Sequence, residues 1–157
     1  MAGAKPIPDG YRSLTPYLIV DGASRAIEFY KAVFGATERM RLGAPGGRVG
    51  HAELEIGDSL IMLADEHPEI GARGPGAYGG SPVGLHVYVA DADAVARKAA
   101  AAGAKLVSPL EDKFYGDRSG TIEDPFGHRW YVSTHIEDVP PDEIDRRVAA
   151  MAKGQGA

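Results

Sequence analysis

Apolar and polar positions follow two periods along this chain, and the two periods alternate. A strand-like run, Leu14–Val20, is followed by residues 23–34, in which apolar side chains recur at helical spacing. Farther along, residues 83–89 form a second strand-like run. Residues 92–102 then form a second helical pattern, with Asp91 as its N-cap. Both segments therefore predict the same local order, a strand followed by a helix.

Three short strand-like runs follow each predicted helix. They are residues 37–42, 48–56 and 59–64 in the first half, and residues 105–110, 117–123 and 129–135 in the second. An offset of 68 residues aligns Gly35 with Gly103 and Glu55 with Glu123 without a gap. The sequence therefore predicts an α+β fold built from two tandem βαβββ repeats.

The length of 157 residues predicts one domain, which we divide into four parts. Residues 12–65 form the first repeat, residues 66–82 a connecting loop rich in Gly and Pro, and residues 83–137 the second repeat. Residues 138–157 form a helical tail. The apolar positions of this tail recur at helical spacing, which indicates that it docks on the body or on a partner subunit.

The period of two along the strands predicts which side chains share a face. In the run 48–56, Ala52 and Leu54 point to one face, whereas His51 and Glu53 point to the other. In the run 83–89, Leu85, Val87 and Val89 share the apolar face, and Gly84, His86 and Tyr88 share the other. A helix needs an apolar surface to pack on, so we expect it to cover the apolar face. The polar faces are then open to a ligand.

Composition narrows the possible functions. The chain has no Cys, which excludes thiolate metal sites and disulfides and leaves His, Asp and Glu as metal ligands. The 17 basic and 22 acidic residues give a formal net charge of -5, so the sequence has no signature of nucleic-acid binding. No apolar run is long enough to span a membrane, and we expect a cytoplasmic protein.

Three features together resemble one known family. They are the paired βαβββ units, the segment Thr15–Ala36, and the run Glu-Asp-Pro-Phe-Gly-His-Arg-Trp at residues 123–130. These resemble the vicinal oxygen chelate superfamily, which groups glyoxalase I, bleomycin- and fosfomycin-resistance proteins and extradiol dioxygenases. Residues 50–65 and 114–120 look most like the PhnB-like subgroup. The resemblance covers residues 12–137 and implies two half-barrels around a cleft, in a homodimer.

The resemblance also implies where a metal would bind. In the metalloenzymes of the superfamily, His and Glu from the first and last strands of each repeat hold a divalent ion. The corresponding positions here are Thr15, Met62, Gly84 and Tyr131. Gly has no side chain, Met is too soft for these metals, and Thr and Tyr are unusual primary ligands. We therefore expect no metal cofactor at this site.

Aromatic side chains predict a binding function. By strand parity Tyr17, Tyr88 and Tyr131 share the polar face, whereas Trp130 points to the helix side and is expected in the core. Such rings bind flat organic molecules by stacking and burial. Further candidate ligand-binding residues are His51, Tyr115 and, as an anion clamp, Arg118. This first hypothesis is a metal-independent protein that binds, and could sequester, an aromatic metabolite or an antibiotic.

A second hypothesis belongs to a different class, a lyase or isomerase. His51, Glu53 and His86 could form a non-standard facial triad for a metal. Without metal, Glu53 and His86 could act as the catalytic general base and general acid. The sequence leaves both hypotheses open, and it identifies neither the ligand nor the substrate.

Overall fold

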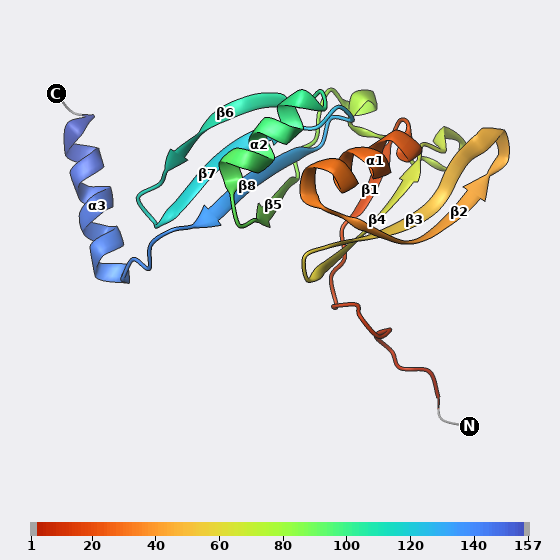
Figure 1. Ribbon diagram of the computed structural model, residues 1–157, viewed down its shortest axis with the longest axis horizontal. Coiled ribbons are helices and arrows are strands. Elements are labelled where there is room, and N and C mark those ends of the chain that lie inside the picture. The colour runs from red at the N-terminus through yellow and green to blue at the C-terminus, as the bar shows by residue number, and fades with distance from the viewer. Residues whose placement is uncertain (1–2, 156–157) are drawn as a thin grey trace. The chain divides into compact units, whose positions relative to one another are not determined.

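The computed structural model describes residues 3–155. The first repeat has the predicted order, one strand, one helix and three strands (Figure 1). Its four strands form one sheet in the order β1-β4-β3-β2, in which β1 and β4 are parallel and the other neighbours are antiparallel. The elements are β1 (Tyr17–Val20), α1 (Ala23–Phe34), β2 (Thr37–Ala44), β3 (Arg48–Ile56) and β4 (Ser59–Asp65).

The second repeat has the same topology. Its sheet has the order β5-β8-β7-β6, again with a parallel first pair. The elements are β5 (Gly84–Tyr88), α2 (Ala92–Ala101), β6 (Lys105–Asp112), β7 (Asp117–Glu123) and β8 (Arg129–His135). The helix α3 (Pro141–Gly154) follows, and three short 3₁₀ helices lie in the connections: η1 (Pro45–Gly47), η2 (Pro68–Ile70) and η3 (Pro75–Tyr78). The predicted α+β fold with tandem βαβββ repeats is confirmed.

The register of the two sheets is equivalent. Tyr17 of β1 pairs with Met62 of β4, and His86 of β5 pairs with Tyr131 of β8, so these strands are related by 69 residues. The inner strands β3 and β7 keep the offset of 68 seen in the sequence. One residue is therefore missing from the helix region of the second repeat, and one is added in its last hairpin.

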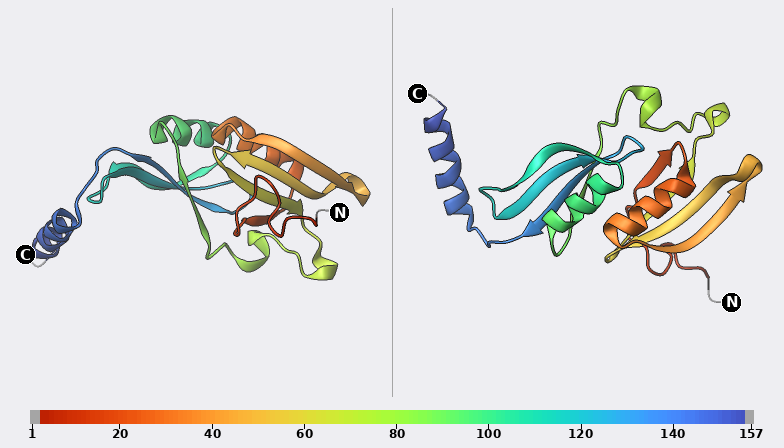
Figure 2. Two further views of the ribbon diagram at one scale, coloured as in Figure 1. Left: turned by 90° about the horizontal axis from the view of Figure 1, so that it is seen from below. Right: turned by 45° about the horizontal axis from the view of Figure 1, so that its top comes forward.

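Each helix covers one face of the sheet in its own repeat (Figure 2). The predicted apolar face of β3 is buried there, with Ala52 and Leu54 fully enclosed. Ile122, Trp130 and Val132 are buried in the second repeat, and the prediction that Trp130 belongs to the core is confirmed. The opposite face of each sheet is free of helix and carries the polar side chains, as the strand period predicted.

The described chain divides into two compact units whose boundaries differ from those of the repeats. Unit 1 comprises the residues up to Val83 together with Asp124–His128, and unit 2 comprises the remainder. The hairpin turn Asp124–His128 of the second repeat thus belongs to unit 1. The hydroxyl of Tyr30 donates to Asp124 Oδ2 at 2.6 Å, and His128 Nε2 bonds the carbonyl oxygen of Ile19 at 3.0 Å.

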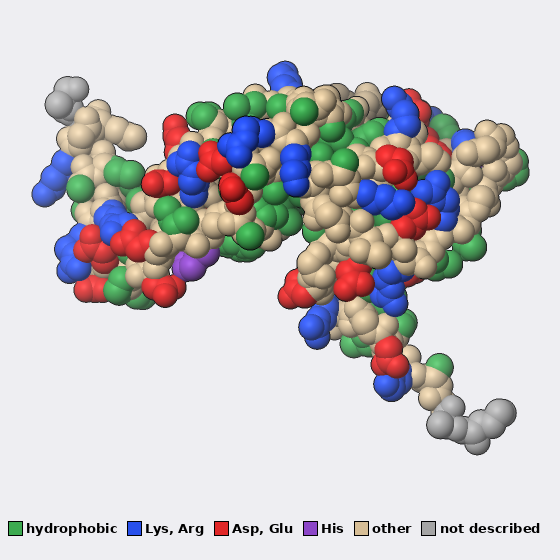
Figure 3. Space-filling view, in the orientation of Figure 1, with side chains coloured by type: hydrophobic (Ala, Val, Ile, Leu, Met, Phe, Trp, Pro, Cys, Tyr) green, Lys and Arg blue, Asp and Glu red, His purple; other side chains and the backbone are tan. Residues whose placement is uncertain are grey.

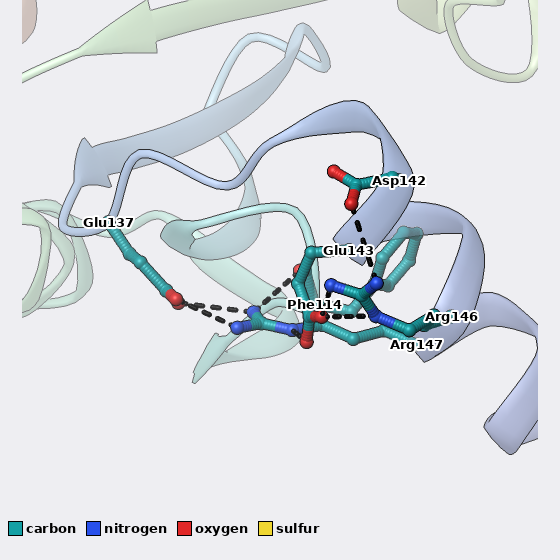
Figure 4. A network of polar contacts seen from close by, with 6 residues as sticks. All are labelled: Phe114, Glu137, Asp142, Glu143, Arg146 and Arg147. Atoms are coloured by element: carbon teal, nitrogen blue, oxygen red, sulfur yellow. Dashed lines mark hydrogen bonds and ion pairs between the residues drawn. The ribbon is translucent and has the colours of Figure 1, made fainter.

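The tail forms α3, a helix as predicted, which is held to unit 2 by arginine contacts (Figure 4). Arg147 donates to the carbonyl oxygen of Phe114 and pairs with Glu137, both outside the helix. The pairs of Arg146 and Arg147 with Glu143 lie within α3. The apolar side chains of Val148 and Met151 stay exposed, so this side of α3 is not docked on its own unit.

Charged side chains of both signs are interspersed over the face shown in Figure 3. This distribution agrees with the small net charge of -5. Among the helices of residues 3–155, none is long and apolar enough to cross a membrane.

Candidate functional site

The helix-free face of unit 1 brings three predicted site residues together. The hydroxyl of Tyr17 on β1 and Nδ1 of His51 on β3 are 2.8 Å apart and hydrogen-bonded. The other ring nitrogen of His51 lies 3.4 Å from Oε1 of Glu53, two residues farther along the same strand. The strand period makes this possible, because residues two apart on a strand share a face.

Tyr11 extends this group, and no pattern in the sequence indicates it. Its hydroxyl is shielded from solvent and lies near the carboxylate of Glu53, and the guanidinium of Arg39 lies 5.8 Å from its ring centre. The Tyr11 hydroxyl and then His51 hold the pKa of Glu53 below its ordinary value, against the opposing effect of burial. Burial raises the pKa of Tyr17, so its hydroxyl stays protonated at neutral pH.

The helix-free face of unit 2 carries a row of three rings. His86 and Tyr88 stack with ring centres 4.8 Å apart and an interplanar angle of 30°. Tyr131 of the neighbouring strand lies 6.2 Å from His86 at 31°. All three side chains are exposed, and Tyr88 keeps 62% of its surface and Tyr131 40%. We call these three residues the ring row.

A buried carboxylate fixes one end of the ring row. Asp117 of β7 is 3% exposed and accepts hydrogen bonds from the Tyr88 hydroxyl at 2.8 Å and from His135 Nδ1 at 2.7 Å. The second nitrogen of His135 bonds Asp138 at 2.8 Å. Burial alone would raise the pKa of Asp117, but the bonds from His135 and Tyr88 hold it below its ordinary value.

The hydrogen bonds to Asp117 and Asp138 raise the pKa of His135, and the bond to Asp117 has the larger effect. None of these three residues was among the predicted candidates. The signal that could have found them is the strand period, since Asp117 and His135 pair directly across β7 and β8 on the polar face.

The four positions at which the resemblance implies metal ligands hold Thr15, Met62, Gly84 and Tyr131. In unit 2, a side chain at Gly84 would overlap the ring of Tyr131, so the ring occupies the space that a ligand at residue 84 would need. In unit 1, the equivalent positions hold Thr15 and Met62, and Met62 pairs with Tyr17 in the register. This donor set does not fit a divalent metal of the superfamily.

The candidates for the enzyme hypothesis are divided between the units. His51 and Glu53 lie together in unit 1, whereas His86 belongs to unit 2, and the pairing of Glu53 with His86 stays a prediction. Within the part of the chain that the structure describes, no group of three or more His, Asp or Glu side chains is arranged to hold a metal ion.

The placement of Arg118 differs from the one expected for an anion clamp. Arg118 lies on the helix side of its sheet, where it pairs with Asp93 of α2 at 2.5 Å and with Asp112 at 3.0 Å. Both carboxylates raise the pKa of Arg118, and Asp93 has the larger effect. The parity of β7 is the reason, because Arg118 follows the buried Asp117 and so points to the opposite face. Tyr115 is exposed in the turn before β7, with its ring edge-on to Phe114.

A pocket of about 390 Å³ lies elsewhere in unit 1. It is open to solvent and is lined by residues of both charges, among them Arg25, Arg48 and Glu66. None of the predicted site residues lines it. It is therefore separate from the polar face described above.

Known proteins resemble this chain in sequence and in fold. The sequence profile of the Glyoxalase/Bleomycin resistance protein/Dioxygenase superfamily matches residues 13–132. The chain belongs to this superfamily. The Mycobacterium bovis relative, the uncharacterized protein Mb0911c, is 40% identical over 145 residues, which cover 90% of this chain and 95% of the relative.

Solved structures of other proteins share the fold of this chain. TioX from Micromonospora sp. ML1 is 29% identical, with a TM-score of 0.62 over 80% of this chain and 99% of TioX. Protein PA1353 from Pseudomonas aeruginosa is 25% identical, with a TM-score of 0.66 over 80% of this chain and 99% of that protein. The glyoxalase-type assignment made from the βαβββ pattern is thereby confirmed at the level of the superfamily.

Proposed function

We propose that this glyoxalase-superfamily protein is a metal-independent small-molecule-binding protein that binds, and so can sequester, a planar aromatic metabolite or antibiotic. The observation that carries the proposal is the ring row on unit 2. Three exposed rings at interplanar angles of about 30° offer flat faces and edges to a ligand. Each well-placed aromatic pair contributes about 0.5–1.5 kcal/mol beyond area burial.

Asp117 supports the proposal because it limits the motion of Tyr88. The Tyr88 hydroxyl is bonded to a carboxylate that is itself buried and bonded to His135. A ring that is already fixed loses less conformational entropy when a ligand stacks on it. The unusual donor set at Thr15, Met62, Gly84 and Tyr131 supports binding without metal.

The finer assignments are also proposals. The runs at residues 50–65 and 114–120 favour the PhnB-like subgroup, and the superfamily resemblance favours a homodimer. The lack of a long apolar run in the sequence favours the cytoplasm. Light scattering of the purified protein measures the oligomeric state directly, and a monomer at micromolar concentration would contradict the dimer.

Binding is tested with indole as a planar probe and cyclohexanol as a non-planar control. In NMR titrations of the full chain, indole should shift the ring signals of Tyr88 and Tyr131, and cyclohexanol should not. Tyr88→Ala should weaken indole binding about two- to tenfold, the range that corresponds to one aromatic pair. Tyr78→Ala is the matched control, because Tyr78 is an exposed tyrosine of η3 in unit 1.

Metal independence has its own measurement. Protein stripped with a chelator should keep its affinity for indole, and added Zn²⁺, Ni²⁺ or Mn²⁺ should leave the melting temperature unchanged. A metal that raises both the melting temperature and the affinity for indole would contradict the proposal. An affinity that Tyr88→Ala leaves unchanged would contradict the role of the ring row.

A further inference from the structure

The pocket of about 390 Å³ in unit 1 lies where several elements meet. Its lining comes from the residues after β1, the end of β4, the start of β3 and the first turn of α1. Sites for small organic molecules typically have volumes of about 300–1,000 Å³, and this pocket falls within that range. No residue of the ring row lines it, so a molecule bound here would be a second ligand.

Two carboxylates at the pocket are engaged by backbone N–H groups. Asp65 accepts three of them, from the start of α1 and from β3. Glu66 Oε1 accepts from the N–H of Gly74 at 2.7 Å. These bonds offset the negative charge of both groups, and those to Asp65 also occupy N–H groups at the start of α1. The helix terminus is therefore not the feature that would attract a ligand.

Two arginines at the pocket are held by carbonyl oxygens instead of carboxylates. Arg48 donates to two backbone oxygens, from Nε at 3.3 Å and from Nη1 at 3.1 Å. Arg25 donates from Nη2 to the carbonyl oxygen of Asp21 at 3.4 Å, and its guanidinium lies 5.7 Å from the ring centre of Phe126. Within residues 3–155, neither guanidinium forms an ion pair with a carboxylate. Their positive charges are thus positioned by the fold but not neutralised by a partner of opposite sign.

Further hydrogen-bond donors at the pocket lack an acceptor in the described part of the chain. The N–H groups of Arg48 Nη2 and of Arg25 Nη1 make no hydrogen bond there. Ser24 Oγ accepts a long bond from Arg41 at 3.4 Å, and its own proton has no described acceptor. Guanidinium groups are strong donors to carboxylate and phosphate oxygens, and their planar fork can bind two such oxygens at once. The lining therefore offers donors to an oxyanion.

The exposed carboxylate of Asp21 limits the charge that the pocket accepts. Asp21 lines the pocket and forms no ion pair within residues 3–155. A phosphate group carries a charge of about −1.5 to −2 at neutral pH, whereas a carboxylate carries a single negative charge. Repulsion from Asp21 is smaller for the group with less charge. The pocket therefore favours a carboxylate over a phosphate.

We propose that this pocket binds the carboxylate of a small organic acid, which accepts hydrogen bonds from the guanidinium groups of Arg48 and Arg25. Two backbone oxygens already hold the Arg48 guanidinium, so it loses little conformational entropy when the ligand binds. The site shares no residue with the ring row and does not depend on the function proposed for it.

The test compares propionate with propionamide, which has nearly the same shape and no charge, and with inorganic phosphate. In NMR titrations of the full chain at constant ionic strength, propionate should shift the Nε–H signals of Arg48 and Arg25 and the backbone amide signal of Gly47, which also lines the pocket. Propionamide should bind at least about tenfold more weakly, because a hydrogen bond to a charged group is the stronger one. Phosphate should bind more weakly than propionate.

Three variants test the charges of the pocket. Arg48→Gln and Arg25→Gln should each weaken propionate binding about tenfold. Asp21→Asn removes the repelling charge and should strengthen it about two- to fivefold. Arg12→Gln is the matched control, because it removes the same charge from an exposed arginine of unit 1 that does not line the pocket, and it should leave the affinity for propionate unchanged.

The variants also separate a loss of binding from a loss of fold. Arg48 holds the turn before β3, so Arg48→Gln affects the fold as well, whereas Arg25→Gln breaks a single long bond. The gain in affinity expected of Asp21→Asn has no explanation in misfolding. Equal binding of propionate and propionamide, or tighter binding of phosphate than of propionate, would overturn the proposal. It would also be overturned by a loss in Arg12→Gln as large as in Arg25→Gln, or by an affinity that Asp21→Asn does not raise.

Discussion

Replacement of Asp65 should reveal how strongly one side chain ties the first repeat together. Asp65 is the last residue of β4 and is buried. Its Oδ1 accepts from the backbone N–H groups of Gly22 at 3.0 Å and Ala23 at 2.8 Å, at the start of α1. Its Oδ2 accepts from the N–H of Val49 on β3 at 2.7 Å. Asp65→Ala removes all three bonds and leaves the donors without a partner.

The magnitude follows from the number and the charge of these bonds. A hydrogen bond to a charged group contributes about 1.5–3 kcal/mol, so the low end for three bonds predicts a loss of about 4–5 kcal/mol. The equivalent residue of the second repeat is Thr134, which accepts from Ala92 N and donates to the carbonyl oxygen of Val89, each at 2.9 Å. Two neutral bonds at about 1 kcal/mol each predict about 2 kcal/mol for Thr134→Val.

Urea denaturation followed by circular dichroism measures both losses on one scale. The slope of the transition should be unchanged, because the surface exposed on unfolding is nearly the same. Asp65→Ala should cost about twice as much as Thr134→Val, a large part of the 5–15 kcal/mol by which domains are usually stable. Equal costs, or a greater cost for Thr134→Val, would refute the argument from charge and bond number.

Three further predictions test other contacts. Gly84→Ala should displace the Tyr131 ring and weaken indole binding. Gly43→Ala, at a strand position with open space, should leave indole binding unchanged. Equal affinities for indole in the two variants would contradict the close packing at residue 84. The pKa of His135 is raised in the folded state, so its stabilising effect is complete below about pH 6.5 and is lost as the pH rises through the folded value. The melting temperatures of the unchanged protein and His135→Asn should therefore converge toward alkaline pH, and parallel curves from about pH 5 to about pH 9 would contradict this. Arg118→Gln should lower the melting temperature but leave indole binding unchanged, because Arg118 pairs with carboxylates on the helix side; a loss of binding would restore it as a ligand clamp.

The repeat architecture could be predicted because each of its signals is local. Strand alternation in residues 48–56 and helical spacing in residues 23–34 need no knowledge of the rest of the chain. The same local rule placed Tyr17, Tyr88 and Tyr131 on the polar faces. It also predicts the helix side for Arg118, since its neighbour Asp117 shares a face with His135, and the expected anion clamp neglected that parity.

The partners of the polar residues could not be predicted, since they come from distant parts of the sequence. Asp65 meets the start of α1 more than forty residues earlier in the chain, and Asp124 accepts from Tyr30 across 94 positions. A single sequence gives no signal for such contacts. The sequence likewise could not predict that residues Asp124–His128 belong to unit 1, because their local pattern indicates only a hairpin turn.

The four positions that correspond to metal ligands in the superfamily occupy equivalent register positions in the two repeats. Thr15 precedes Tyr17 by two positions, just before β1, and Gly84 precedes His86 by two positions, at the start of β5. Met62 is the register partner of Tyr17, and Tyr131 is the register partner of His86. The positions that hold metal ligands in the metalloenzymes of the superfamily thus lack them in both repeats. In unit 2, the space at Gly84 is filled by the ring of Tyr131, which is also the end of the ring row. The two strands β5 and β8 therefore build an aromatic surface within the fold of the superfamily, and this surface is the basis of the proposal that the protein binds its ligand by stacking and without a metal.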